Sequence, residues 1–268
     1  MNSYRILLCL FVAAIGSNVW SQTSTVATGE GDSRPRQPQI TINDDGRIFV
    51  VFGRANEIFV SHSDDGQSFS SEVKVAELPK LALGMRRGPR IASVEKSHVV
   101  SAISHETGDL MAWHSTDAGD SWSQGVVVNS VPRSAREGLH GIASGPEGSV
   151  YLVWLDLRSG NTEIYLSKSS NAGASWSENF RVYRSPSGTV CECCHPSVSV
   201  GPDGRVVVMW RNLVDGDRDM YLALSENGQS FGPAQKLGTG SWPLNACPMD
   251  GGDLSMDQDG IVTTAWRR

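Results

Sequence analysis

The chain has 268 residues, of which 23 are Lys or Arg and 29 are Asp or Glu, giving a formal net charge of −6. This length can bury a substantial core, but the acidic balance lacks the basic excess that a nucleic-acid-binding surface needs, so we expect no nucleic-acid partner. With 28 glycines, 8 tryptophans and little sustained helical periodicity, the composition favours short strands joined by tight turns.

The N-terminal segment has the pattern of a secretory signal peptide. Arg5 precedes an apolar run over residues 6–15, and small or polar residues follow up to Gln22. The apolar run is too short to span a membrane. We therefore predict a signal peptide over residues 1–21, a linker over residues 22–34, and a secreted or periplasmic protein without a membrane span.

A turn motif recurs four times along the rest of the chain. Its copies lie 53 to 55 residues apart, at residues 64–69, 117–122, 171–176 and 226–231. Each copy separates two stretches of alternating apolar and polar residues, so each is predicted to be a hairpin turn. The central glycine permits a positive φ, the Asp or Asn accepts turn N–H groups, and the final aromatic residue covers the hairpin.

A second set of turns alternates with the first. These turns lie at residues 45–47, 95–97, 147–148, 203–204 and 259–260, and all but the second contain Gly. Each repeat therefore holds four short strands, which is the unit of a propeller blade. The predicted fold is all-β: a propeller of four-stranded blades over residues 35–268, with four blades and part of a fifth.

The second copy of the turn motif, from Ser115 to Trp122, resembles the Asp-box, or bacterial neuraminidase (BNR) repeat, of sialidases. The resemblance covers roughly residues 35–268 and implies a six-bladed parent fold. It also implies an exo-alpha-sialidase-type glycoside hydrolase (neuraminidase) or a binder of an acidic, sialic-acid-like glycan.

The sequence ends at Arg268, directly after the second predicted strand of the fifth blade. Two explanations stay open: a truncated product, which we favour, or a ring completed by another chain. An incomplete ring would expose a blade face and strand edges. A homodimer through this edge is therefore a further expectation.

Residues just before the innermost strands are the candidates for a functional site, because these strands begin near the mouth of the central channel. The segments are residues 36–38, 86–90, 137–140, 191–196 and 247–253. Nearly all carry charge, His or Cys where a structural turn needs only Gly, Pro or Asn. We therefore expect them to converge on an acidic glycan or another small ligand.

The sialidase resemblance implies an arginine cluster that holds a carboxylate, a carboxylic acid for the leaving group, and a tyrosine nucleophile supported by Glu. The candidate substrate-binding residues are Arg36, Arg54, Arg87, Arg90, Arg211, His140 and Asp250. Glu57 and Glu137 are the candidate catalytic carboxylates. Tyr151, Tyr165 and Tyr221 fall inside predicted strands and are expected to pack in the core, so whether the chain is an enzyme stays open.

Four cysteines, Cys191, Cys193, Cys194 and Cys247, allow two interpretations. In an exported protein they predict disulfides and no cofactor; a vicinal Cys193–Cys194 bond is disfavoured, which leaves Cys247 bonded to Cys193 or Cys194. The alternative is a copper or zinc site formed by these cysteines and His195. This second reading corresponds to a non-catalytic extracytoplasmic propeller whose Cys/His-rich channel mouth binds a metal or a partner.

Overall fold

The computed structural model describes residues 23–268. Residues 1–22, which hold the predicted signal peptide and Cys9, lie outside the described part. Within residues 23–268 the chain forms eighteen β-strands and one short 3-10 helix, η1 (Gly31–Ser33). None of the helical structure in this range is long and apolar enough to cross a membrane.

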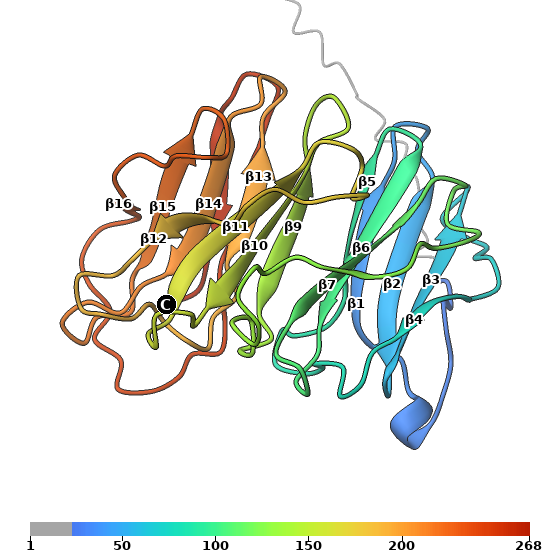
Figure 1. The fold of residues 1–268 in the computed structure, drawn as a ribbon, viewed down its shortest axis with the longest axis horizontal. Helices are drawn as coiled ribbons and strands as arrows, with labels where there is room; N and C mark the ends of the chain where they lie inside the picture. Colours follow the sequence, from blue (N-terminus) through green and yellow to red (C-terminus); the bar gives the residue numbers. More distant parts are fainter. Residues whose placement is uncertain (1–22) are drawn as a thin grey trace, which may run out of the picture.

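Four antiparallel four-stranded sheets and one two-stranded sheet stand side by side (Figure 1). The first two sheets contain β1 (Arg36–Ile42), β2 (Ile48–Arg54), β3 (Glu57–Ser63), β4 (Val73–Glu77), β5 (Arg90–Val94), β6 (Ser97–Ile103), β7 (Leu110–Ser115) and β8 (Val126–Val127). The next two contain β9 (His140–Ser144), β10 (Val150–Asp156), β11 (Glu163–Ser169), β12 (Phe180–Tyr183), β13 (Ser197–Val200), β14 (Val206–Arg211), β15 (Met220–Ser225) and β16 (Gln235–Lys236). The last sheet contains β17 (Asp253–Met256) and β18 (Val262–Ala265).

Strand order within every sheet follows the sequence. The first strands of successive sheets contact one another in turn, β1 with β5, β5 with β9, β9 with β13, and β13 with β17. These first strands therefore form the innermost layer. The predicted all-β propeller, with two strands of a fifth sheet, is confirmed.

The recurring turn motif joins the third strand of each four-stranded sheet to the outermost fourth strand. In the second copy, Asp117 Oδ1 accepts the Ser121 N–H at 3.0 Å, and the Ser115 hydroxyl accepts the Gly119 N–H at 2.9 Å. Hydrogen bonds from Ser121, chiefly from its hydroxyl, lower the pKa of Asp117 to about 2. The motif thus stabilises a turn on the outer side of the sheet, far from the innermost strands, and supplies no chemistry to the channel.

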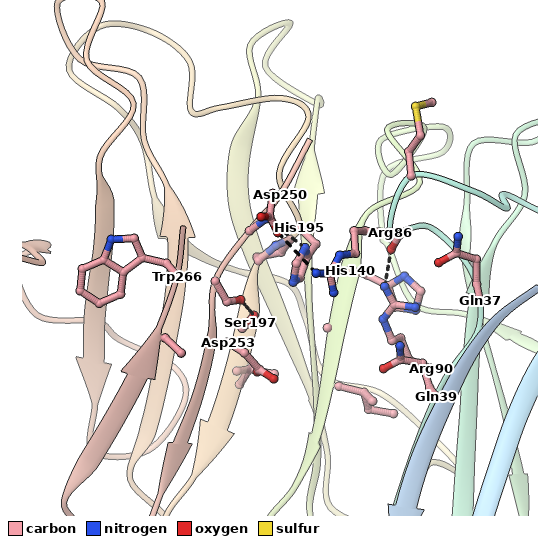
Figure 2. A pocket seen from close by; sticks show the side chains of 18 of the residues that line it. Gln37, Gln39, Arg86, Arg90, His140, His195, Ser197, Asp250, Asp253 and Trp266 are labelled. Atoms are coloured by element: carbon pink, nitrogen blue, oxygen red, sulfur yellow. Dashed lines mark hydrogen bonds and ion pairs between the residues drawn. The ribbon is translucent and has the colours of Figure 1, made fainter. Parts of the chain in front are cut away.

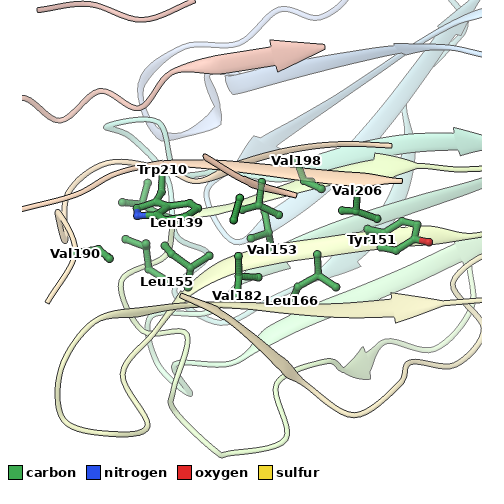
Figure 3. Close-up of a cluster of buried hydrophobic side chains, with 13 residues drawn as sticks. Leu139, Tyr151, Val153, Leu155, Leu166, Val182, Val190, Val198, Val206 and Trp210 are labelled. Atoms are coloured by element: carbon green, nitrogen blue, oxygen red, sulfur yellow. The ribbon is translucent and has the colours of Figure 1, made fainter. Parts of the chain in front are cut away.

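The apolar core lies between neighbouring sheets. Side chains of β10 pack against those of β14, among them Tyr151, Val153, Val206 and Trp210 (Figure 3). Trp154 and Trp210 occupy equivalent positions in β10 and β14, and both are 0% exposed. Because each buried aromatic ring removes about 150–250 Å² from water, these contacts fix the spacing of the sheets. That spacing in turn sets where the ends of the innermost strands lie.

Candidate functional site

The ends of the innermost strands surround a cavity of about 1020 Å³ (Figure 2). It is lined by residues 37–40, 85–86, 90–91, 140–142, 195–198, 250–253 and 265–267. Each of the five segments expected to converge contributes at least one lining residue. The repeat, rather than proximity in sequence, brings these segments together.

Arg90 is a buried cation in the wall of this cavity. Its side chain is only 7% exposed in the folded chain, and it donates hydrogen bonds to the carbonyl oxygens of Gly88 and Pro89, each at 3.2 Å, and of Arg86. Burial, and then the nearby charge of Arg86, lower the pKa of Arg90 to about 10. Among residues 23–268, no carboxylate forms an ion pair with Arg90.

Asp250 lies at the cavity between two arginines. Its carboxylate pairs with Arg86 Nη2 at 3.5 Å and with Arg267 Nε at 3.2 Å. The wall thus carries three arginines (Arg86, Arg90 and Arg267) against two aspartates (Asp250 and Asp253). One positive charge is in excess when the histidines are neutral, so the wall favours an anion.

Two histidines complete the polar wall. His140 Nε2 and the Ser101 hydroxyl lie 3.0 Å apart, whereas His140 Nδ1 is buried and has no hydrogen-bond partner within residues 23–268. His195 Nδ1 accepts the Gly251 N–H at 3.3 Å, which places the proton of the neutral ring on Nε2. Burial, together with the charge of Arg90, lowers the pKa of His140 well below its usual value and that of His195 to about 4. Arginine, not histidine, therefore supplies the positive charge of the wall at neutral pH.

The lowered pKa of His195 predicts a loss of stability in mild acid. Between pH 6.5 and about 4 the unfolded chain binds the His195 proton more readily than the folded chain, so stability falls as the pH falls through this range. We expect the free energy of unfolding of the wild type to drop by about 2 kcal/mol more than that of His195→Gln between pH 7 and pH 5. Urea denaturation at both pH values measures this difference.

Glutamine is the matched replacement because its Oε1 can still accept the Gly251 N–H. An identical pH dependence in wild type and His195→Gln would contradict the assignment of His195 as a neutral side chain whose partial burial lowers its pKa.

No family model matches this sequence, and no curated protein matches it. Among solved structures, a protein of unknown function from Dyadobacter fermentans is similar, with a TM-score of 0.59 and 15% identity over 90% of this chain and 77% of that protein. A polysaccharide lyase of family PL25, an ulvan lyase bound to -[GlcA(1-4)Rha3S]-, gives a TM-score of 0.54 and 13% identity over 87% of this chain and 62% of the lyase. The NanB sialidase of Streptococcus pneumoniae gives a TM-score of 0.49 and 14% identity over 65% of this chain and 28% of the sialidase. At such identities, likeness shows the fold alone.

Three of the predicted binding residues, Arg90, His140 and Asp250, line the cavity. The other predicted site residues, Arg36, Arg54, Arg87, Arg211, Glu57 and Glu137, are not among the residues that line it. Arg36 is exposed at the start of β1. Sequence position therefore predicts the segments that line this cavity but only some of the side chains that line it.

Arg54 and Glu57 lie on the face of the first sheet that points away from the second sheet. Arg54 binds Glu72, with Nη1 and Oε2 2.7 Å apart, and its guanidinium lies 4.9 Å from the ring centre of Phe59. Glu57 forms an ion pair with Lys74. The alternation of the strands accounts for this placement, because Phe49, Val51, Ile58 and Val60 face the second sheet, and the positions between them point away from it.

Arg87 and Arg211 bind backbone carbonyl groups near the cavity, among them that of Glu137. Arg87 Nε donates to the carbonyl oxygen of Glu137 at 2.7 Å, joining the second and third sheets. Burial raises the pKa of the Glu137 carboxyl. Arg211 is 1% exposed and donates to the carbonyl oxygens of Arg218, Asp250 and Arg267. Arg211 therefore holds the two segments that carry the Asp250–Arg267 ion pair.

The four cysteines of residues 23–268 form one disulfide and two thiols. Cys193 is bonded to Cys247, one of the two pairings left open by the sequence, and this bond ties the segment before β13 to the segment before β17. The second predicted disulfide is absent, because Cys191 and Cys194 are free and their Sγ atoms lie 3.3 Å apart. The hydrogen bond with Cys194, followed by the charge of Arg218, lowers the pKa of Cys191 to about 6, and the same contact raises that of Cys194.

Arg86 and Asp253 line the cavity from within the expected segments but were not among the candidate side chains, and Trp266 and Arg267 lie outside those segments. A signal existed for the last two, because Trp266-Arg267 repeats the pair Trp210-Arg211 one blade later. No pattern in the sequence distinguishes Arg86 from its neighbour Arg87.

Proposed function

We propose that the chain binds an acidic carbohydrate, of the sialic acid or uronic acid class, in the cavity between the innermost strands. The observation that carries this proposal is Arg90, a buried arginine in the cavity wall that has no carboxylate partner among residues 23–268. A buried charge is costly unless it is paired. A ligand carboxylate supplies the missing partner.

Arg90 has donors to spare for such a ligand. A guanidinium carries five N–H groups, and the hydrogen bonds of Arg90 to backbone carbonyls use only Nη1 and Nη2. The neighbouring Arg86 is 62% exposed at its side chain, so it is free to move from Asp250 towards a second ligand oxygen. Two arginines at one carboxylate give the charge-assisted hydrogen bonds that are strongest in proteins.

The remaining wall suits a sugar ring. A cavity of about 1020 Å³ lies at the upper end of the range for small-molecule sites, about 300–1,000 Å³. Gln37 and Gln39 offer amide groups to hydroxyls (Figure 2), and Ile40 and Met85 add apolar surface. The wall therefore combines an anionic subsite with polar and apolar groups of the kind that sugars contact.

The wall supports binding better than sialidase-type hydrolysis. That reaction uses a tyrosine nucleophile supported by Glu, together with a carboxylic acid. Among residues 23–268, no tyrosine or glutamate lines the cavity. Tyr151 and Tyr165 are buried strand residues, as expected from the sequence. We therefore place binding, rather than glycoside hydrolysis, first.

Calorimetric titration with N-acetylneuraminic acid, glucuronic acid and neutral glucose tests the proposal. Glucuronic acid is included because the similar ulvan lyase is bound to a saccharide that contains it. We expect binding of one or both acidic sugars and none of glucose. Arg86→Gln should weaken binding of the acidic sugar about 10- to 100-fold, the loss of one charge-assisted hydrogen bond.

Arg181→Gln is the matched control, because Arg181 is exposed on the outermost strand β12 and lies outside the cavity. Equal weakening by both variants, or no binding of either acid at millimolar concentration, would overturn the proposal. Turnover of a fluorogenic sialoside would instead establish the hydrolytic version.

A further inference from the structure

Three cysteine sulfurs lie close together in the segment that precedes β13. Cys191 Sγ lies 3.3 Å from Cys194 Sγ and 3.6 Å from Cys193 Sγ, and all three lie within 4.8 Å of one another. Cys191 and Cys194 are each 1% exposed. Arg218 Nη1 donates to Cys191 Sγ at 3.0 Å. Two of the three cysteines are therefore buried, and the cluster is rich in sulfur and in contact with a cation.

We propose that, in the reduced chain, the thiolates of Cys191, Cys193 and Cys194 bind one Cu(I) ion. Soft thiolate ligands select soft ions such as Cu(I). With metal–sulfur bonds of about 2.3 Å, three sulfurs in a plane around an ion lie about 4 Å apart. The observed separations of 3.3 and 3.6 Å need to widen by less than an ångström, which side-chain rotation supplies.

Charge balance favours a monovalent ion over zinc. Three thiolates carry three negative charges. Arg218 contacts Cys191, and the charge of the buried Arg211 reaches Cys194. With Cu(I), the ion and the two guanidiniums offset the three thiolates, whereas Zn²⁺ leaves one positive charge buried without a partner, which is costly.

The geometry reduces the five ligands considered from the sequence to three. His195 Nδ1 accepts the Gly251 N–H, and its ring lines the cavity. Cys247 is bonded to Cys193 but is not part of the group of sulfurs that lie within 4.8 Å of one another. Cys247 is therefore the cysteine that is released when the disulfide is reduced, and it is not a ligand.

Loading the site consumes one dithiol reductant. The dithiol gives two electrons and two protons to the Cys193–Cys247 disulfide, which becomes two thiols while the dithiol becomes a disulfide. Binding of Cu(I) then displaces whatever protons remain on Cys191, Cys193 and Cys194. Cys247 stays a free thiol, and the chain segment before β17 loses its covalent tie to the segment before β13.

The test titrates the whole chain, reduced with a dithiol under nitrogen and freed from the reductant, with Cu(I) against a chromophoric Cu(I) chelator. We expect one Cu(I) per chain to be withheld from the chelator. Cys191→Ser and Cys194→Ser should lose this copper at chelator concentrations that leave the wild type loaded. Cys247→Ser is the matched control, since it removes a cysteine without removing a ligand. It should bind one Cu(I) even without reduction.

Alkylation followed by trypsin keeps the proposal testable if a serine variant fails to fold. All three ligands lie in the tryptic peptide of residues 185–205, and Cys247 lies in that of residues 237–267. Cu(I) should protect three thiols in the first peptide and leave Cys247 reactive. Absence of copper binding, protection of all four cysteines, or tighter binding of Zn²⁺ than of Cu(I) would each overturn the three-thiolate Cu(I) site.

Discussion

Asp156→Ala is expected to lower the free energy of unfolding by about 3–5 kcal/mol, the range for breaking a buried ion pair by removal of one partner. Asp156 is 0% exposed at the end of β10. Its carboxylate accepts hydrogen bonds from the Ser134 hydroxyl at 2.7 Å, from Trp154 Nε1 at 2.8 Å and from Arg158 Nε at 2.8 Å. Alanine leaves the donors of Ser134 and Trp154 buried without partners, and each such group carries its own desolvation cost, whereas Arg158 still contacts Asn179.

Asp203→Ala is the matched control, because Asp203 pairs with Arg205 at the same sequence spacing as Asp156 with Arg158. The side chains of this second pair are 49% and 33% exposed, so water replaces the lost contacts and we expect a much smaller change. Urea denaturation of the three proteins at pH 7 measures both effects. Equal losses in the two variants would show that the burial of Asp156 has no energetic importance.

Gly173→Ala is expected to destabilise the fold by about 2–4 kcal/mol, from a strained backbone and an overpacked core together. Gly173 has a φ of +87°, and a Cβ at this position would lie 2.6 Å from Cγ2 of Val99. Val99 belongs to β6 in the preceding sheet and is 0% exposed. Its side chain therefore has no free space into which it could move away from an added Cβ. The turn glycine is therefore required for the close approach of two sheets as well as for its φ.

Gly204→Ala separates the two causes. Gly204 has a φ of +83°, and a Cβ added there meets nothing within 4 Å, so only the backbone strain of about 1 kcal/mol remains. Thermal unfolding monitored by circular dichroism compares the two variants with the wild type. A loss in Gly204→Ala as large as that in Gly173→Ala would contradict the role of contact with Val99.

The strands and turns of this protein could be predicted because they depend on short-range patterns. The turn residues Asp117 and Gly119 act through hydrogen bonds and a backbone angle within their own turn. The alternation of apolar residues in β10 and β14 likewise reflects burial between sheets. Local patterns of this kind can be recognised in a single sequence.

The candidate site could be predicted only in outline. The segments before the innermost strands do line the cavity, but Arg87 binds the Glu137 carbonyl while Arg86 lines the wall. The two residues are adjacent and chemically identical. Their roles differ because neighbouring side chains point in different directions, and the residue type alone does not predict that direction.

By itself, the sequence determined the repeat, the four-stranded sheets and the set of segments that meet at the channel, because each rests on turn chemistry and strand alternation within a repeat. Only the tertiary structure decided that Arg90 is buried with no carboxylate partner in the described part of the chain, and that Arg54 faces away from the second sheet. It also decided that Cys191 and Cys194 remain thiols beside Arg218. These properties depend on the packing of one sheet against the next, which brings together side chains from segments about fifty residues apart.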